Sequence, residues 1–135
     1  LILVLLRSWW LQAPPAPETR MVVVMDDLGT SNPAMTVVWE PGGAGDRLMR
    51  IRVIGHAEMG PGTAWELWML PGGDQKPVSL GLITTHETQT VKVPKTLAAR
   101  LDAADGLAMS VEPAGGSPTG LPSGPVLYAG KCVKV

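Results

Sequence analysis

The sequence predicts an all-β protein, an antiparallel β-sandwich of about seven to nine short strands with at most one short helix. Three observations lead to this class. Short segments with β-strand periodicity recur along most of the chain, and turn residues (16 Gly and 13 Pro) separate them at short intervals. A single segment has the spacing of a helix. A length of 135 residues with 45% hydrophobic residues corresponds to one domain with its own core.

The first predicted strands carry their apolar residues in two patterns. Residues 21–25 form a β-branched run that we expect to be buried. In 35–39, Met35, Val37 and Trp39 alternate with more polar positions. In 48–54, Met49, Ile51 and Val53 share one face, and Arg50 and Arg52 share the other.

The next predicted strand, 65–70, has large side chains on both faces. Trp65, Leu67 and Met69 point one way, whereas Glu66, Trp68 and Leu70 point the other way. A strand with bulky residues on both faces is expected inside a sheet, not at its edge. Strands 78–83 and 88–93 follow.

Residues 96–105 are the helix candidate. Leu97 and Leu101 are four residues apart, Thr96 is placed to cap the first turn, and Gly106 suits the position after the last turn.

The C-terminal part predicts a strand, a long turn and a second strand. The strand 107–111 ends before Pro113, because proline donates no ladder hydrogen bond, and 125–129 resumes the extended pattern. Between them, residues 113–124 hold four glycines and three prolines. We expect Gly115 or Gly116 to adopt a positive φ angle and the loop to fold back over the sheet.

The N-terminal part is expected to lie outside the folded domain, which is assigned to residues 21–135. Residues 1–6 are apolar and are followed by Arg7 and two tryptophans. One interpretation is that the segment 1–10 is the trimmed outer end of a transmembrane helix or lies next to the membrane. The other is that it forms a short element packed on the domain. Residues 11–20, with three prolines, are expected to form an extended tether.

The residues exclude several function classes. A net charge of −1 gives no reason to expect nucleic acid as a partner. His56, His86 and Cys132 are too few and too widely spaced for a zinc or copper centre. No serine has the G-x-S-x-G context of a hydrolase, and no glycine run has the lysine of a phosphate-binding loop. We therefore expect no enzyme activity, no metal and no cofactor.

Two carboxylates and the remaining special residues have structural interpretations. Glu66 and Glu112 are expected to be partly buried acceptors that hold a long loop, with Arg50 or Arg52 as a possible ionic partner; a ligand-sensing pair is the alternative. Trp39, Trp65 and Trp68 are expected in the core. Cys132 is expected to be an inert thiol. The alternative is that it forms a disulfide between two subunits of a homodimer.

Two blocks of sequence resemble a known family. The run SVEPAGGSPTG from Ser110, followed by GPVLYAG from Gly124, is similar to the C-terminal extracytoplasmic domain of anti-sigma-K factors. Upstream, AWELWMLPGG from Ala64 and PVSLGLI from Pro77 are similar to that family's other conserved block. The residues that carry this resemblance are Trp65, Glu66, Leu67, Trp68, Ser79, Leu80, Gly81, Glu112, Pro113, Gly115, Gly116, Ser117, Pro118, Gly124 and Pro125.

The resemblance implies a regulatory role. The parent would be a single-pass protein of the inner membrane whose cytosolic N-terminal domain holds an extracytoplasmic-function sigma factor. The domain described by this sequence would then face the periplasm, and periplasmic and intramembrane proteases would release the sigma factor. The family's cytosolic zinc motif, a His followed by Cys-x-x-Cys, has no counterpart in a chain with one cysteine. A cell-surface or periplasmic binding module remains the alternative, and a small periplasmic enzyme or metal carrier a further one.

Overall fold

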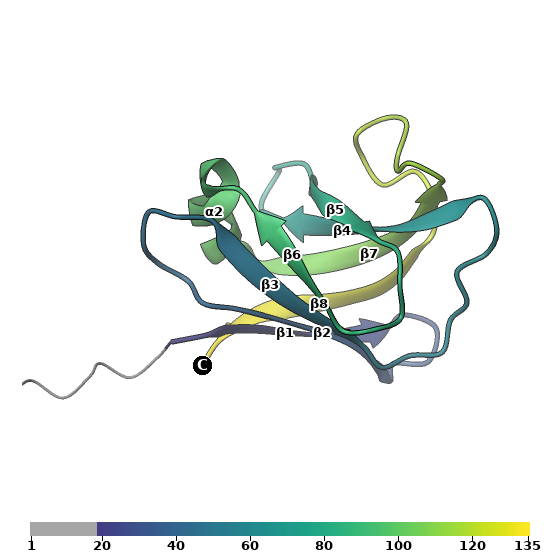
Figure 1. The fold of residues 1–135 in the computed structure, drawn as a ribbon, viewed down its shortest axis with the longest axis horizontal. Helices are drawn as coiled ribbons and strands as arrows, with labels where there is room; N and C mark the ends of the chain where they lie inside the picture. Colours follow the sequence, from purple (N-terminus) through teal and green to yellow (C-terminus); the bar gives the residue numbers. More distant parts are fainter. Residues whose placement is uncertain (1–18) are drawn as a thin grey trace, which may run out of the picture.

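The computed structural model describes residues 19–135, so the predictions for segments 1–10 and 11–18 lie outside the described residues. Eight strands and one helix follow one another along the chain (Figure 1). In chain order they are β1 (Met21–Asp27), β2 (Pro33–Trp39), β3 (Arg47–Val53), β4 (Thr63–Leu70), β5 (Val78–Ile83), β6 (Gln89–Val93), α2 (Lys95–Asp102), β7 (Gly106–Pro113) and β8 (Val126–Lys134).

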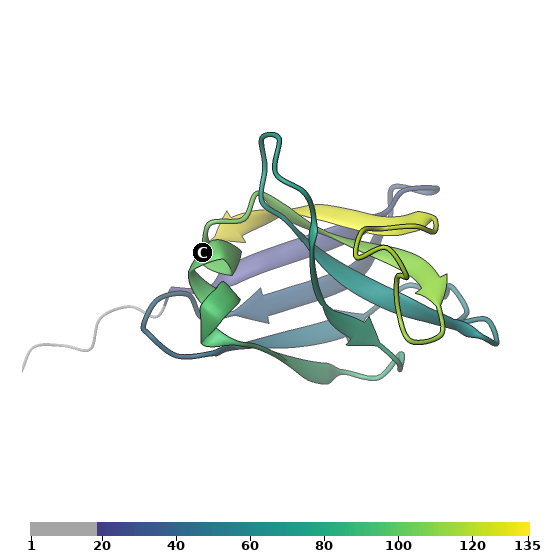
Figure 2. The ribbon, with the colours of Figure 1, turned by 90° about the horizontal axis from the view of Figure 1, so that it is seen from above.

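All eight strands belong to one antiparallel sheet with the order β5-β4-β7-β8-β1-β2-β3-β6. The sheet curls on itself until its two edge strands, β5 and β6, come into contact, so that the sheet is nearly closed (Figures 1 and 2). The predicted all-β class, with antiparallel strands and one short helix, is confirmed. β4 lies between β5 and β7, as its two bulky faces predicted.

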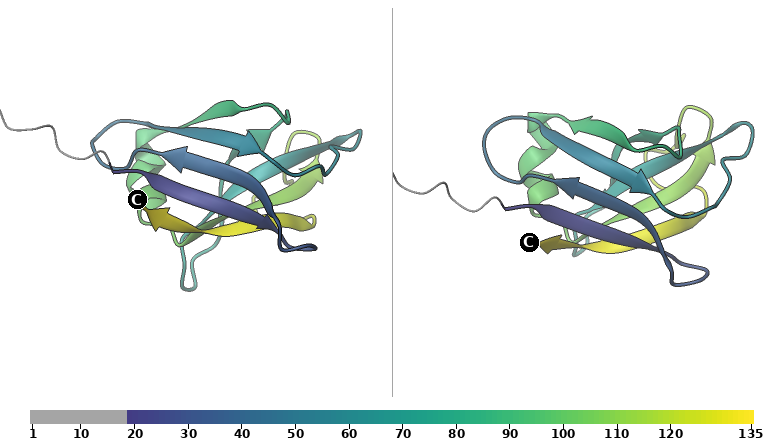
Figure 3. Two further views of the ribbon diagram at one scale, coloured as in Figure 1. Left: turned by 90° about the horizontal axis from the view of Figure 1, so that it is seen from below. Right: turned by 60° about the horizontal axis from the view of Figure 1, so that its bottom comes forward.

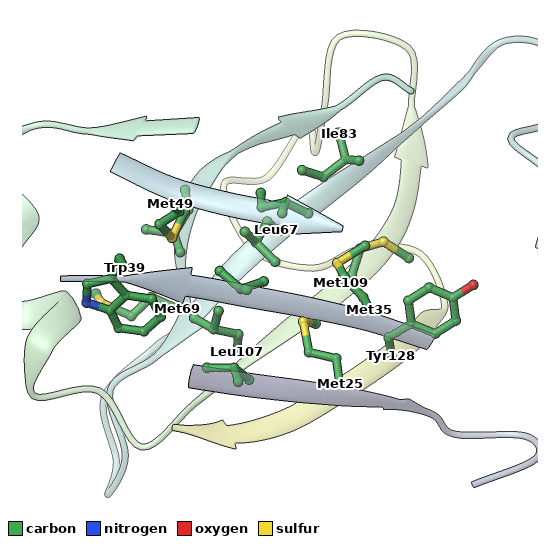
Figure 4. Close-up of a cluster of buried hydrophobic side chains, with 14 of the residues drawn as sticks. Met25, Met35, Trp39, Met49, Leu67, Met69, Ile83, Leu107, Met109 and Tyr128 are labelled. Atoms are coloured by element: carbon green, nitrogen blue, oxygen red, sulfur yellow. The ribbon is translucent and has the colours of Figure 1, made fainter. Parts of the chain in front are cut away.

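The inner face of the curled sheet holds the core, which is rich in methionine (Figure 4). Most strands contribute every second residue, whereas β5, which carries a bulge, contributes Leu80 and Ile83. The unbranched methionines fill the irregular space between these side chains. Trp39 and Trp65 are also buried there, as predicted. The fully buried residues of this core include Met25, Met35, Trp39, Met49, Ile51, Trp65, Leu67, Met69, Ile83, Leu101 and Tyr128.

Two strands differ from their prediction in a way that matters for the surface. β1 is not a fully buried run: Met21, Val23 and Met25 point inward, whereas Val24 is 46% exposed on the outer face. β8 continues beyond the predicted end at residue 129 to Lys134 because its last three residues pair with Met21, Val22 and Val23 of β1.

The helix starts and ends differently from the prediction. Thr96 does not cap it; instead, the backbone N–H of Lys95 donates to Oδ1 of Asp46 (2.8 Å), a side chain from the β2–β3 turn. The helix ends at Asp102, and Gly106 opens β7 rather than following the last turn. A Cβ atom at Gly106 would lie 2.5 Å from the carbonyl oxygen of Gly130, so this glycine is required by the close approach of β8.

Candidate functional site: a loop clasped by two buried carboxylates

The candidate site lies on the outer face of β5, β4 and β7, under the loop 113–125. Glu66 in β4 is paired with Ser110 in β7, and Ser79 in β5 lies on the other side of Glu66. These residues occupy outward positions, yet Glu66, Ser110 and Glu112 are at most 7% exposed. The loop therefore buries polar side chains that the sheet alone would leave in solvent.

Glu66 holds the first half of the loop. Its Oε1 accepts a hydrogen bond from the backbone N–H of Ser117 (2.7 Å), and its Oε2 accepts one from the hydroxyl of Ser79 (2.5 Å). The carboxylate thus joins the loop to β5 through β4.

Glu112 holds the second half of the loop. Its oxygens accept from the hydroxyl of Ser110 (2.6 Å), from the hydroxyl and backbone N–H of Ser123, and from the backbone N–H of Gly124 (3.1 Å). Burial alone would raise the pKa of Glu112, but the hydrogen bonds from Ser110, Ser123 and Gly124 outweigh it and hold the pKa below its ordinary value. Glu112 is therefore a buried anion that neutral donors stabilise.

Trp68 extends this network beneath the loop. It is fully buried on the outer side of β4, and its indole N–H donates to the hydroxyl of Ser110 (2.8 Å). Ser110 accepts from Trp68 and donates to Glu112, so its single proton and one lone pair are both used. We call Glu66, Ser79, Ser110 and Glu112 the loop clasp.

The loop has the backbone that its glycines predicted. Gly115 and Gly116 both have positive φ angles (89° and 102°), and Ala114 donates to the carbonyl of Gly62 (2.9 Å). At the other end of the loop, a Cβ atom on Gly124 would lie 1.7 Å from the carbonyl oxygen of Val111. The predicted positive φ and the fold-back over the sheet are confirmed.

The predicted arginine partners of the carboxylates are wrong. Arg50 and Arg52 lie on the exposed outer face of β3, and four strands separate β3 from β4 along the sheet order. Hydroxyl and backbone N–H donors take their place. Strand order depends on pairing between distant parts of the chain, which periodicity within one strand does not report.

The other positions that carry the resemblance are divided between the core and the loop. Trp65 and Leu67 point into the core, and Leu80 is buried in β5. The carbonyl of Pro125 accepts from Val111 N–H (2.9 Å) where the loop rejoins the sheet. The remaining residues of the resemblance have roles in the backbone or lie on the surface. Gly81 has a φ angle of 128°, Pro113 is the exposed last residue of β7, and Pro118 is exposed in the loop.

A second polar network was not predicted. Arg47, only 4% exposed, forms a salt bridge with Asp102 of α2 (Nη2 to Oδ2, 2.7 Å). Asp102 also accepts from the indole N–H of Trp39 (3.0 Å) and the backbone N–H of Gly42 (2.8 Å). Burial acts to raise the pKa of Asp102, but the hydrogen bonds from Arg47, Gly42 and Trp39 bring it below its ordinary value.

A sequence signal for this network existed. Arg47 precedes Met49 by two residues, so the alternation of Met49 and Ile51 places Arg47 on the same inward face. Asp102 follows the buried Ala98 by about one helical turn and so lies on the same side of α2. A charged residue at an inward position implies a partner of opposite charge.

The histidines and the cysteine take the structural roles that their spacing favoured. His56 and His86 are exposed, and Nε2 of His86 contacts the carbonyl of Ala57 at 2.7 Å. Burial, together with a smaller contribution from the charge of Asp105, raises the pKa of Cys132 to about 11. Across residues 19–135, no three His, Cys, Asp or Glu side chains are grouped as metal ligands.

The geometry of the clasp favours a structural role in fastening the loop over a catalytic role. Both carboxylates are already engaged by two or more donors, and the groups around them are hydroxyls, amides and an indole. General acid–base catalysis needs a group that can exchange its proton with a substrate. The clasp instead fastens both ends of a long loop.

Comparison with known proteins identifies one family. Within residues 19–135, the protein has no helix of the length and apolarity needed to cross a bilayer. No curated protein and no solved structure matches the chain. The family model described as "Anti-sigma-K factor rskA, C-terminal" matches residues 1–126, which include β1 to β7 and the whole loop. That family is regulatory rather than catalytic and is associated with membranes. The chain belongs to the anti-sigma-K factor C-terminal family.

Proposed function

We propose that residues 21–135 form the extracytoplasmic sensor domain of a single-pass anti-sigma factor of the inner membrane. In this proposal, a cytosolic domain preceding the sequence binds an extracytoplasmic-function sigma factor. Proteolysis outside and then within the membrane releases that sigma factor. Family membership supports the anti-sigma role, and the clasp supports a domain built to stay folded.

The observation that carries the proposal is the position of β1. This first strand lies in the interior of the sheet, paired with β2 on one side and β8 on the other. The pairing begins at Arg20, whose backbone exchanges two hydrogen bonds with Val135 (3.0 and 2.8 Å). The folded domain therefore starts at the last residue of the predicted tether 11–20, with no loose spacer after Arg20.

This arrangement gives the domain a way to control proteolysis. Proteases bind their substrates as extended chain, and segments held in a sheet are cut only after local unfolding. While β1 stays paired, a protease must work on the tether 11–20 directly beside the folded domain. Unfolding or release of the domain would give the protease room, so the folded domain acts as a guard of the tether.

A pull-down with the cognate sigma factor tests the assignment. The 135-residue chain should not retain a sigma factor, because its family's sigma-binding part lies outside this sequence, whereas the full-length parent should retain it. Retention by the 135-residue chain alone would contradict the proposed division of labour. Failure of the parent to retain any extracytoplasmic-function sigma factor would contradict the anti-sigma role.

A further inference from the structure

The outer face of β8, β1, β2, β3 and β6 differs from the face under the loop. Val133, Val22 and Val38 lie side by side on adjacent strands, and the same row continues through Arg50 to Thr90. The exposed apolar residues of this face include Leu48 (61%), Val133 (54%) and Val24 (46%). We call this surface the basic–apolar face; it comprises Arg20, Val22, Val24, Val38, Leu48, Arg50, Arg52, Thr90, Lys92, Lys131, Val133 and Val135.

Within residues 19–135, no other element covers the basic–apolar face. The loop 113–125 lies over β4 and β7, and α2 lies at the end of the sheet, whereas β1, β2 and β3 are open to the viewer in Figure 3. The face is also hollowed. A depression of about 680 Å³ crosses β2, β3 and β6, and a second of about 460 Å³ lies beside it. Arg20 and Val38 line both depressions, so the two are continuous.

The face carries more cations than anions. Its cations are Arg20, Arg50, Arg52, Lys92 and Lys131, whereas Asp26 is exposed on the outer side of β1 and Glu40 and Asp46 line the larger depression. Arg50 and Arg52 are exposed in its centre, and neither makes an ion pair with any of residues 19–135. Lys131 adds a further exposed cation, and Lys92 pairs with Asp46 at 3.6 Å at one end of the face. A second copy would present the same excess of positive charge, which works against self-association through this face. A surface of anionic groups would be attracted.

The position of the face relative to the chain's N-terminus favours a membrane. Arg20 belongs to the face and is also the last residue of the tether that we propose to connect to the bilayer. A fully extended tether of ten residues spans at most about 35 Å, which is close to the diameter of a small domain. The domain is therefore kept at the bilayer surface, where even weak contacts are populated because the local concentration of lipid is high.

We propose that the basic–apolar face rests on the bilayer and binds anionic phospholipid headgroups. Arg50, Arg52 and Lys131 would contact lipid phosphates, and Leu48 with the exposed valines would enter the headgroup region. This inference rests on the proposed membrane attachment. It adds an orientation, with the tether lying between the bilayer and the domain, where a protease has least access.

Vesicle co-sedimentation of the whole 135-residue chain tests this inference. Residues 1–6 are apolar and should bind neutral and anionic bilayers alike, so the informative quantity is the difference between two kinds of vesicle. We expect the chain to bind vesicles containing phosphatidylglycerol at least about tenfold more tightly than pure phosphatidylcholine vesicles. The double variant Arg50→Glu/Arg52→Glu should lose this preference, and Leu48→Ser should weaken binding to the anionic vesicles.

A matched control separates the face from net charge. Lys76→Glu/Arg100→Glu makes the same change in charge at exposed positions of the β4–β5 turn and α2, outside the face, and should keep the preference. Unchanged circular dichroism and melting temperature would show that all variants fold. Equal loss in both double variants, or no preference in the wild-type chain, would overturn the inference. The sigma-factor pull-down would be unaffected by either result, so the two proposals fail independently.

Discussion

Glu112 is a buried carboxylate that is stabilised without a cation. The donors that lower its pKa are Ser110, Ser123 and Gly124, and they bind the ionised form. Because its pKa is lower in the folded than in the unfolded state, Glu112 contributes stability above its unfolded pKa of about 4.3. That contribution is lost as the pH falls through the folded pKa.

The pH dependence gives a prediction for Glu112→Gln. At pH 7 the variant should lose about 1–2 kcal/mol of unfolding free energy, because an amide nitrogen cannot accept the bonds that a carboxylate oxygen accepts. Below about pH 4 the difference from wild type should shrink as the wild-type carboxylate is protonated. Urea unfolding at several pH values measures both quantities, and a difference that stays constant with pH would contradict the account.

Cys132 gives a second prediction at this scale. With a pKa of about 11, its thiolate fraction at pH 8 is about a hundredfold smaller than that of an ordinary cysteine. The folded chain should therefore react with Ellman's reagent about a hundredfold more slowly than free cysteine, and guanidinium should abolish the difference. Reaction at the rate of free cysteine in the folded state would show that the thiol is exposed and available for pairing.

At the scale of single elements, the geometry of the loop 113–125 can be tested by comparing the stabilities of Gly→Ala variants at three of its glycines. A side chain at Gly124 would collide with the backbone of Val111. A side chain at Gly115 would meet no neighbour, so a substitution there costs only the strain of a positive φ angle. Gly115→Ala should cost about 1 kcal/mol of stability, and Gly124→Ala several times more or prevent folding. Gly116→Ala should lie between them, because its Cβ would approach Oε1 of Glu66 at 3.1 Å. Equal melting temperatures for the three variants would refute the loop geometry.

The Arg47–Asp102 salt bridge joins the first residue of β3 to the last residue of α2, and we predict that the two side chains are energetically coupled. Removing either partner leaves a poorly solvated charge, so Arg47→Ala and Asp102→Ala should each cost about 2 kcal/mol or more. The double variant should cost clearly less than the sum, because it leaves neither charge behind. Thermal or urea unfolding of the four proteins measures this coupling. Additive losses would mean that the two side chains act independently.

The elements also show what the sequence can predict. Apart from the end of β8, strand positions were predicted to within a few residues, because alternation within a strand is a local signal; residues 78–83 match β5 fully. The partners of Glu66 and Glu112 were not predicted, because they depend on which strands are adjacent. The start of α2 was missed for the same reason, since its capping group, Asp46, comes from a distant turn.

At the scale of the molecule, the same division appears. Composition and turn spacing predicted the all-β class, and two conserved-looking blocks identified the family. The curling of one sheet until β5 meets β6 depends on twist and bulges accumulated over eight strands, such as the bulges at Leu80 in β5 and Leu127 in β8. The basic–apolar face was also beyond prediction, because residues 21–25 were expected to be wholly buried.

Limited proteolysis of the 135-residue chain, mapped by mass spectrometry, tests the central claim that the folded domain guards its own tether. With a non-specific protease, the first cuts should fall between Trp10 and Met21, while the interior of the sheet stays intact. A variant that destabilises the fold, such as Arg47→Ala, should be cut faster in this same segment. Cleavage of the tether at the same rate in the wild-type chain and in Arg47→Ala, or first cuts within 41–46 or 113–124 with the tether intact, would contradict the account.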